Sequence, residues 1–478
     1  MSRQDHIKVS TDLLQKITSE QAWHYSIIPG YDNGQEMKLF ISEDKARNPG
    51  IKDELEVLLG KQLTLEPADP QLIFKSLGRH YRRGRKQGQT AVKTGGLKSE
   101  DFLLDLIEEA NNVGSSDIHM EAYEDSCRIR MRIDGKLSER YIIEKEEYPA
   151  LINKIKIMGN LDIAEKRLPQ DGRIFFKRHK DKFDIRVSVL PALYGEKVVM
   201  RLLSKDATSI DIESLGFNAA QIDDYTMGIK KPHGIILISG PTGSGKTTTL
   251  YATLKILNRE ETNILTIEDP IEYTLAGINQ VQLKETIGLT FASALRTFLR
   301  QDPDIIMLGE IRDSETAQMA VRAALTGHLV LSTIHTNSAM GTITRLMDMG
   351  VPSFLVANTL VLSVAQRLIR LLCPHCKKAT PFDEGLYPGN FSPPAKVTEH
   401  FLPVGCEHCY YTGYRGRKAI YEVIPVNRVL ANHIKEGNFN PDEIMKNEEI
   451  KSLADCAFAD FKAGNTSLEE IFPVLIER

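Results

Sequence analysis

The sequence predicts an α/β protein of several domains, built around a largely parallel sheet with helices on both faces. The chain has 478 residues, which corresponds to roughly three domains of about 150 residues each. Beyond about residue 210, short apolar runs alternate with helical segments, as expected for buried parallel strands. The runs lie at residues 235–239, 264–268, 305–308 and 329–333.

Composition and charge argue against several classes of protein. The chain has 60 Lys and Arg residues and 64 Asp and Glu residues, which gives a net charge of -4. It therefore lacks the basic excess of a dedicated nucleic-acid binder. We expect no stable nucleic-acid partner.

The most apolar stretch, residues 354–365, is interrupted by polar residues and is shorter than the roughly 20 residues of a membrane span. With no signal-peptide pattern at the N-terminus, the expected location is the cytoplasm.

The first part of the chain predicts a small α+β module over residues 1–82. Residues 51–59 have a helical apolar pattern, and residues 37–41 read as a strand bounded by turn residues. Residues 83–99 contain five basic residues, four glycines and no acid, which is typical of a flexible basic linker. It is either a solvated tether or a contact with acidic protein, nucleotide or anionic lipid.

A second, mixed α/β domain is expected over residues 100–206. Residues 101–110 have a helical apolar pattern, and residues 128–133 alternate strictly before Asp134 and Gly135, a strong hairpin signal. That alternation places only arginine on one face of the strand, and residues 183–189 repeat the period of two. The third domain is expected over residues 210–478.

A phosphate-binding loop follows the first apolar run of this third domain. It fits Gly-x4-Gly-Lys-Ser/Thr between a strand and a helical segment. Its glycines allow backbone N–H groups to surround phosphate oxygens. Lys246 would bind the β and γ phosphates of ATP, and the Thr247 hydroxyl would bind Mg²⁺. The expected nucleotide-binding residues are Gly240, Pro241, Thr242, Gly243, Ser244, Gly245, Lys246, Thr247 and Thr248.

Two acids are candidates for orienting an attacking water. Glu268 ends the run at 264–268, and Glu310 follows Gly309 after the run at 305–308. The carboxyl ends of parallel strands form the ligand-binding edge of such a sheet, so either acid could polarise water. Alternatively, both cap strand ends or pair with Arg300 and Arg312.

Two histidines flank the run at 329–333. His328 precedes it and His335 follows it, and at seven residues apart they would point to opposite faces of a strand. A histidine in such a place is usually structural. We expect His335 to be the better candidate for contact with phosphate.

Four of the six cysteines form two Cys-x-x-Cys pairs, Cys373 with Cys376 and Cys406 with Cys409. Four thiolates in two turns suit tetrahedral Zn²⁺ without an open position, and hence a structural site. We expect a zinc subdomain over residues 368–420. The basic residues at 415–418 also allow a nucleic-acid zinc ribbon, although few aromatic residues accompany them.

Together these motifs resemble the secretion ATPases of type II secretion and type IV pilus assembly. Residues 266–272 resemble that family's Asp box, residues 309–313 its atypical Walker B box with glutamate after glycine, and residues 327–336 its His box. The two cysteine pairs resemble its tetracysteine motif, in the same order. The resemblance implies a RecA-like C-terminal domain, a PAS-like domain at about 100–206 and a homo-hexameric ring.

The resemblance also implies functional residues and partners. Arg186 and Arg201 match the arginines that reach the phosphates in the family, although both could simply lie on a solvated strand face. Implied partners are an inner-membrane platform protein and a membrane-anchored docking protein, with peripheral association at the inner membrane. The tetracysteine motif favours export or assembly over pilus retraction.

The implied function is an ATPase that powers type II secretion or type IV pilus assembly. The alternatives are a nucleic-acid-binding or translocating P-loop protein and a nucleotide-binding regulator that does not hydrolyse ATP.

Overall fold

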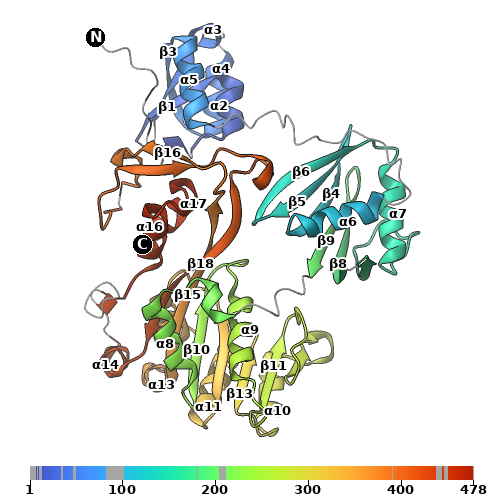
Figure 1. Ribbon diagram of the computed structural model, residues 1–478, viewed down its shortest axis with the longest axis vertical. Helices are drawn as coiled ribbons and strands as arrows, with labels where there is room; N and C mark the ends of the chain where they lie inside the picture. The colour runs from blue at the N-terminus through green and yellow to red at the C-terminus, as the bar shows by residue number, and fades with distance from the viewer. Residues whose placement is uncertain are drawn as a thin grey trace. The chain divides into compact units, whose positions relative to one another are not determined.

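The computed structural model contains sheets of three, six, seven and two strands (Figure 1). The chain divides into two compact units, one of residues 1–92 and 379–400 and the other of residues 93–378 and 401–478. The predicted linker at 83–99 lies outside the described residues. The structure describes residues 7, 9, 13–14, 16–33, 36–46, 50–81, 102–179, 181–203, 211–389, 391–437, 444–445 and 450–476.

The first unit contains the three-stranded sheet, in the order β1-β2-β3. β1 and β2 are antiparallel, and β3 runs parallel to β2. Apolar side chains such as Leu39, Leu55 and Leu77 form one buried cluster between strands and helices. The predicted strand at 37–41 and helix at 51–59 are confirmed as β2 and α4. The bounds are α2 (Ser19–Tyr25), β1 (Ile27–Asp32), β2 (Glu36–Ser42), α3 (Glu43–Ala46), α4 (Gly50–Leu59), β3 (Gln62–Ala68) and α5 (Pro70–His80).

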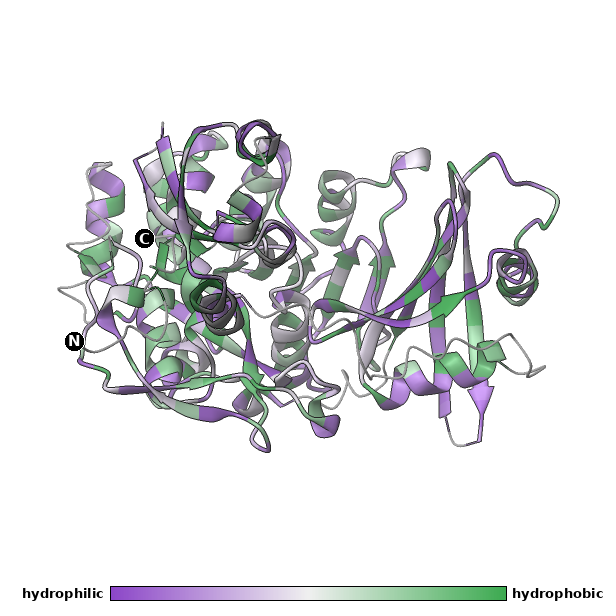
Figure 2. Cartoon of the chain, turned by 90° about the horizontal axis from the view of Figure 1, so that it is seen from above, coloured by the Kyte–Doolittle hydropathy of each residue, from purple (hydrophilic) through white to green (hydrophobic). Residues whose placement is uncertain are grey.

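A six-stranded antiparallel sheet follows, in the order β6-β5-β4-β9-β8-β7. Alternate strand residues such as Ile129 and Val187 share a buried core with α6 and α7, and hydrophobic and hydrophilic residues alternate along its strands (Figure 2). The predicted helix, hairpin and second strand are confirmed. The bounds are α6 (Phe102–Asn112), β4 (Ser115–Ala122), β5 (Cys127–Ile133), β6 (Lys136–Ile143), α7 (Tyr148–Met158), β7 (Gln170–Arg178), β8 (Asp181–Ala192) and β9 (Gly195–Leu203).

The arginine face of this sheet is neutralised by acids on the neighbouring strand. Glu121 on β4 accepts hydrogen bonds from Arg128 Nε at 3.0 Å and Arg130 Nη2 at 2.7 Å. Lys197 lies 3.2 Å from the same carboxylate. Burial opposes ionisation, but these cations lower the pKa of Glu121 to about 2. Arg132 Nε lies 3.3 Å from Asp117 on the same neighbouring strand, so the three arginines predicted to share a face have partners within the sheet.

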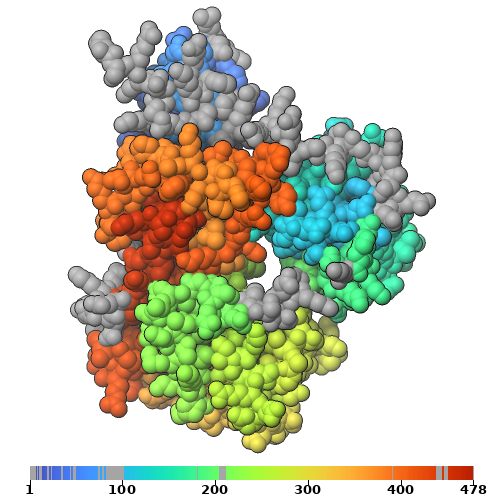
Figure 3. All heavy atoms as spheres, viewed as in Figure 1, coloured from blue at the N-terminus to red at the C-terminus, as the bar shows by residue number. Residues whose placement is uncertain are grey.

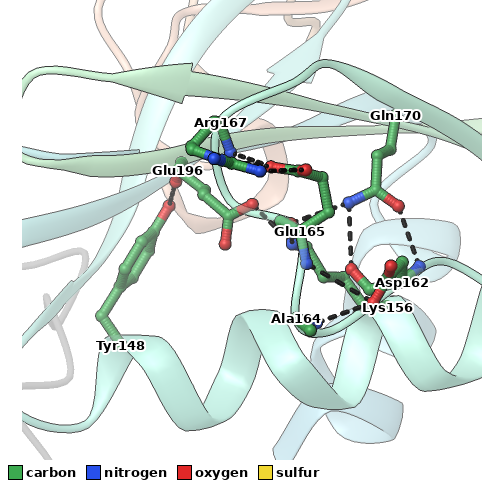
Figure 4. Close-up of polar contacts among 8 residues, drawn as sticks. All are labelled: Tyr148, Lys156, Asp162, Ala164, Glu165, Arg167, Gln170 and Glu196. Atoms are coloured by element: carbon green, nitrogen blue, oxygen red, sulfur yellow. Dashed lines mark hydrogen bonds and ion pairs between the residues drawn. The ribbon is translucent and has the colours of Figure 1, made fainter.

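The segment between α7 and β7 is held by a buried lysine. Lys156 is 0% exposed, and its Nζ donates to the Glu165 carbonyl at 2.7 Å and pairs with Glu196 at 2.6 Å (Figure 4). Gln170 Nε2 donates to the same carbonyl and to that of Asp162, both at 3.0 Å. The side chains of one helix and two strands thus fix the path of this loop.

The seven-stranded sheet has the order β12-β11-β13-β14-β10-β15-β18. All neighbouring strands are parallel except β15 and β18. All four predicted strands are confirmed. The strand bounds are β10 (Gly234–Ser239), β11 (Ile264–Glu268), β12 (Asn279–Gln282), β13 (Ile305–Leu308), β14 (Leu329–Ile334), β15 (Leu360–Leu372) and β18 (Tyr414–Pro425).

Helices cover both faces of this sheet. α8 and α9 share a core with Ile236 and Ile238 of β10, whereas α11, α12 and α13 contact the central strands from the other side. α16 packs on β15 and β18, and α17 packs on β15. The C-terminal residues, red in Figure 3, lie on the face that it shows. The helix bounds are α8 (Ala219–Ile229), α9 (Lys246–Leu257), α10 (Phe291–Phe298), α11 (Ser314–Leu325), α12 (Ala339–Asp348), α13 (Ser353–Thr359), α14 (Arg428–Glu436), α16 (Leu453–Lys462) and α17 (Leu468–Ile476).

The apolar stretch at 354–365 does not form one element. It comprises most of α13 and the first half of β15. Among the described residues, each helix is too short or too polar to cross a membrane. Between the two cysteine pairs the chain forms a small sheet from β16 (Lys378–Pro381) and β17 (Glu399–Leu402).

Candidate active site

The phosphate-binding loop connects β10 to α9, as its motif requires. Gly240, Gly243 and Gly245 have φ values of 144°, 80° and 89°, which disfavour any residue with a side chain. A Cβ at Gly240 would lie 2.4 Å from the Gln366 carbonyl oxygen. α9 begins at Lys246, so the unpaired N–H groups of its first turn face the loop, an arrangement that binds anions.

A cavity of about 890 Å³ brings the predicted residues together. Residues 242–248 line it, together with Glu268, Glu310 and His335. Gly240 and Pro241 shape the loop without lining the cavity. Lys246 Nζ donates to the carbonyls of these two residues at 2.7 and 3.0 Å. Burial lowers the pKa of Lys246, with Glu310 opposing the shift.

Glu268 is enclosed by neutral donors at the end of β11. It is 3% exposed and accepts hydrogen bonds from the Tyr251 hydroxyl, from Thr266 Oγ1 at 2.6 Å and from Gln280 Nε2 at 3.1 Å. Burial and the hydrogen bond to Glu268 raise the pKa of Tyr251. The carboxylate is therefore held from three sides by groups that remain uncharged at neutral pH.

Glu310 has basic neighbours instead. It follows β13, accepts a hydrogen bond from Arg312, and lies 3.2 Å from His335 Nε2. Burial opposes ionisation, but Arg312 and His335 together lower the pKa of Glu310. The expected pairing of Glu310 with Arg312 is found, whereas Arg300 donates to the Arg296 carbonyl.

The two histidines occupy different environments. His335 lines the cavity beside Glu310. His328 Nδ1 lies 2.8 Å from the Ala323 carbonyl and 3.1 Å from Thr326 Oγ1, at the C-terminus of α11. The structure therefore places His335 in the site and gives His328 a local structural environment.

Arg186 and Arg201 are not among the residues that line this cavity. Arg186 Nη2 donates to the Ile271 carbonyl at 2.5 Å, and Nη1 pairs with Glu272 at 3.2 Å. Arg201 Nε lies 2.9 Å from Asp117. Both arginines instead line a separate cavity of about 330 Å³ on the six-stranded sheet.

The four cysteines form a compact cluster. Cys373 and Cys406 sulfurs are 3.9 Å apart, and Cys409 sulfur lies 3.8 Å from those of Cys376 and Cys406. Four sulfurs at about 2.3 Å from a tetrahedral zinc ion would be about 3.8 Å apart. The Gly405, Cys406 and Gly413 amides donate to cluster sulfurs at 3.2 Å, as backbone amides around metal-bound thiolates do.

Two residues near the cavity were not predicted from the sequence: Gln366, which lines it from β15, and Tyr421 on β18. Neither residue lies in a recognisable motif. The signal that could have identified them is the pairing of β15 with β18, which was not predicted because a long insertion separates these strands.

The chain has relatives among secretion and pilus proteins. Residues 95–473 match the family described as type II/IV secretion system protein. The type II secretion system ATPase E of Vibrio cholerae is 46% identical, covering 80% of this chain and 77% of the relative. The type IV pilus assembly ATPase PilB of Myxococcus xanthus is 42% identical, covering 97% of this chain and 86% of the relative.

Solved structures show the same fold. The pilus retraction motor PilT with bound ADP has a TM-score of 0.53 and 26% identity, covering 78% of this chain and 96% of that one. The ATPase DotB of Legionella pneumophila has a TM-score of 0.58 and 20% identity, covering 80% of this chain and 99% of that one. These likenesses confirm the predicted α/β class with a RecA-like P-loop domain. The chain belongs to the type II/IV secretion system protein family, which confirms the family indicated by its motifs.

Proposed function

We propose that this chain is an ATPase that powers type II secretion or type IV pilus assembly. One observation carries the chemistry: Glu268 and Glu310 line the same cavity as the phosphate-binding loop with Lys246. A P-loop alone binds nucleotide, whereas hydrolysis also needs a group that orients water. The relatives that are named ATPases support hydrolysis rather than regulation.

Each residue has a distinct role in this proposal. Lys246 and the loop amides bind the phosphates of ATP. The Thr247 hydroxyl would provide a hard oxygen ligand of the kind that suits Mg²⁺, and the ion would neutralise phosphate charge when bound. Glu310 orients the attacking water, with Glu268 as the alternative carboxylate. His335 holds Glu310 and reaches toward the γ phosphate.

Arg186 and Arg201 are proposed to contact phosphate after a movement between the six-stranded and seven-stranded sheet domains. Both are now paired with acids, so contact with phosphate requires exchange of those partners. Arginine suits this role because its planar fork stabilises charge on phosphoryl oxygens.

Zn²⁺ is proposed as the metal of the tetracysteine cluster, with a structural role. The sulfur separations and amide donors fit tetrahedral coordination by four thiolates. No fifth ligand position is needed, so we assign no chemical step to this metal. We also propose the domain bounds 1–82, 100–206 and 210–478, with the zinc subdomain at 368–420.

The proposed setting is a cytoplasmic homo-hexamer, peripherally associated with the inner membrane through a platform protein and a membrane-anchored docking protein. Residues 1–82 are proposed to dock a partner. The match of the Myxococcus xanthus pilus assembly ATPase over 97% of this chain, together with the four cysteines, favours assembly or export over retraction.

Phosphate release from ATP, measured per subunit over a range of protein concentrations, tests the proposal. Lys246→Ala should abolish release, and the exposed Lys231→Ala should not change it. Activity per subunit that rises with concentration supports a site completed by assembly. Equal, trivial release from all three proteins, with ATP still bound, would favour a non-hydrolysing regulator. Salt-dependent binding of single-stranded nucleic acid would favour the translocating alternative.

A further inference from the structure

Side chains from two neighbouring strands contact one hydroxyl of the helix that follows the phosphate-binding loop. Thr249, in the first turn of α9, is 0% exposed. Its Oγ1 donates to Gln366 Oε1 at 2.9 Å and lies 3.2 Å from the Tyr421 hydroxyl. Gln366 and Tyr421 are direct cross-strand partners of β15 and β18. Thr249 Oγ1 also lies 3.4 Å from the Gly245 carbonyl, and either hydroxyl can donate in its contact with Tyr421.

The hydrogen bond from Thr249 fixes the orientation of the Gln366 amide. With Oε1 toward Thr249, Nε2 lies against the last glycine of the loop, 2.9 Å from where a Cβ on Gly245 would be. The backbone carbonyl of Gln366 lies against the first glycine, Gly240. One residue, 1% exposed, therefore contacts both ends of the phosphate-binding loop.

Tyr421 is itself held rigidly. Its ring stacks on Phe217 with centroids 3.6 Å apart, and its carbonyl accepts a hydrogen bond from Gln221 Nε2 at 2.7 Å. The tyrosine hydroxyl thus has a defined position. Tyr421, Thr249 and Gln366 form one chain of hydrogen-bonded side chains, and Gln366 packs against the loop.

We propose that Gln366 is a positioning residue that sets the phosphate-binding loop for the β phosphate, and that Tyr421 acts on it through Thr249. The proposal rests on the nucleotide site proposed above. The Gln366 amide packs closely against Gly245. The next residue, Lys246, begins the helix whose N–H groups would bind phosphate. Losing that amide frees the loop backbone and weakens contacts with the β phosphate. ADP has the β phosphate that this loop is proposed to bind, and AMP lacks it.

Binding of ADP and of AMP to the full chain, measured by calorimetry with Mg²⁺, tests this inference. Gln366→Ala should weaken ADP binding about tenfold, equivalent to about 1.4 kcal/mol, and AMP binding less than twofold. Tyr421→Phe should give a smaller loss with the same selectivity. The two effects should be less than additive in the double variant, since both act through Thr249. The exposed Gln318→Ala is the matched control.

Equal losses of ADP and AMP affinity, or no loss, would overturn the inference. If Gln366→Ala does not fold, Thr249→Val removes the shared hydroxyl at nearly constant volume and should show the same selective loss. Thr249→Ser, which keeps the hydroxyl, should restore ADP binding. Lys246→Ala separates the two proposals: if it leaves ADP binding intact, the proposed nucleotide site itself is wrong.

Discussion

Glu268 and Glu310 lie at the ends of neighbouring parallel strands, and their carboxylates have opposite surroundings. Glu268 accepts from three uncharged side chains, whereas Glu310 contacts Arg312 and His335. A carboxylate already saturated by neutral donors is fixed in place and has little capacity left for water. A carboxylate paired with an arginine stays ionised, and Glu310 lines the cavity. The surroundings therefore distinguish Glu268 from Glu310, whereas the sequence alone made both acids candidates for the same role.

Glu310→Gln should keep ATP binding but lower kcat by about 100-fold or more, the usual contribution of a general base. Glu268→Gln should mainly reduce stability, because its new amide donor would face three existing donors. Equilibrium ATP binding and single-turnover hydrolysis separate the two effects. Unchanged turnover in Glu310→Gln would transfer the catalytic role to Glu268.

The sequence predicted the placement of candidate site residues where they are adjacent in the chain. The P-loop, the acids after β11 and β13, and the cysteine pairs each lie in a local motif whose spacing determines its shape. Such motifs sit at strand ends, so the topology of a parallel sheet brings them together. That is why Lys246, Glu268 and Glu310 line one cavity.

Long-range pairing was not predictable in the same way. The arginines on one face of β5 were predicted, but their partner Glu121 on β4 was not, because strand neighbours are not encoded by alternation. Gln366 meets Tyr421 only because β15 pairs with β18 across an insertion. The contacts of Arg186 with Ile271 and Glu272 likewise join residues far apart in the chain.

Acid should weaken the six-stranded sheet through Glu121. Its pKa is lowered to about 2 in the folded protein, below the value of about 4.3 for unperturbed glutamate. A lowered folded pKa stabilises the fold above the unfolded pKa, and that stabilisation is lost as pH falls through this interval toward 2. Thermal unfolding followed at decreasing pH should show this loss. Glu121→Gln should be less stable near neutral pH and should have a flatter profile over the same interval; an unchanged slope would contradict the assignment.

Metal removal should loosen the end of the β15–β18 pair. β15 ends at Leu372, beside Cys373, and Leu372 pairs with Tyr414 at the start of β18. Gln366 and Tyr421 lie farther along the same ladder, which α16 and α17 cover. Treatment with a strong chelator should therefore lower the thermal unfolding temperature and leave ATP affinity unchanged.

Re-addition of Zn²⁺ should restore the unfolding temperature, and Mg²⁺ should not, since four thiolates favour the softer ion. If chelation instead removes ATP affinity together with the metal, the cluster braces the phosphate-binding loop through the strand pair.

Lys156 provides a test of how the loop between α7 and β7 is held. Lys156→Met leaves Glu196 charged and mostly buried, and breaking a buried pair in this way costs about 3–5 kcal/mol. It also removes the donor to the Glu165 carbonyl. In the unsubstituted protein the amides of Asp162 and Ala164 donate to nearby side chains, and hydrogen exchange at these two amides should accelerate in the variant. The exposed Lys166→Met should leave exchange unchanged.

Adding Glu196→Leu to Lys156→Met should recover stability, since apolar replacement of both partners is often neutral, without restoring the slow exchange of the loop. Recovery of both would mean that Glu196, rather than the bond to Glu165, fixes the loop.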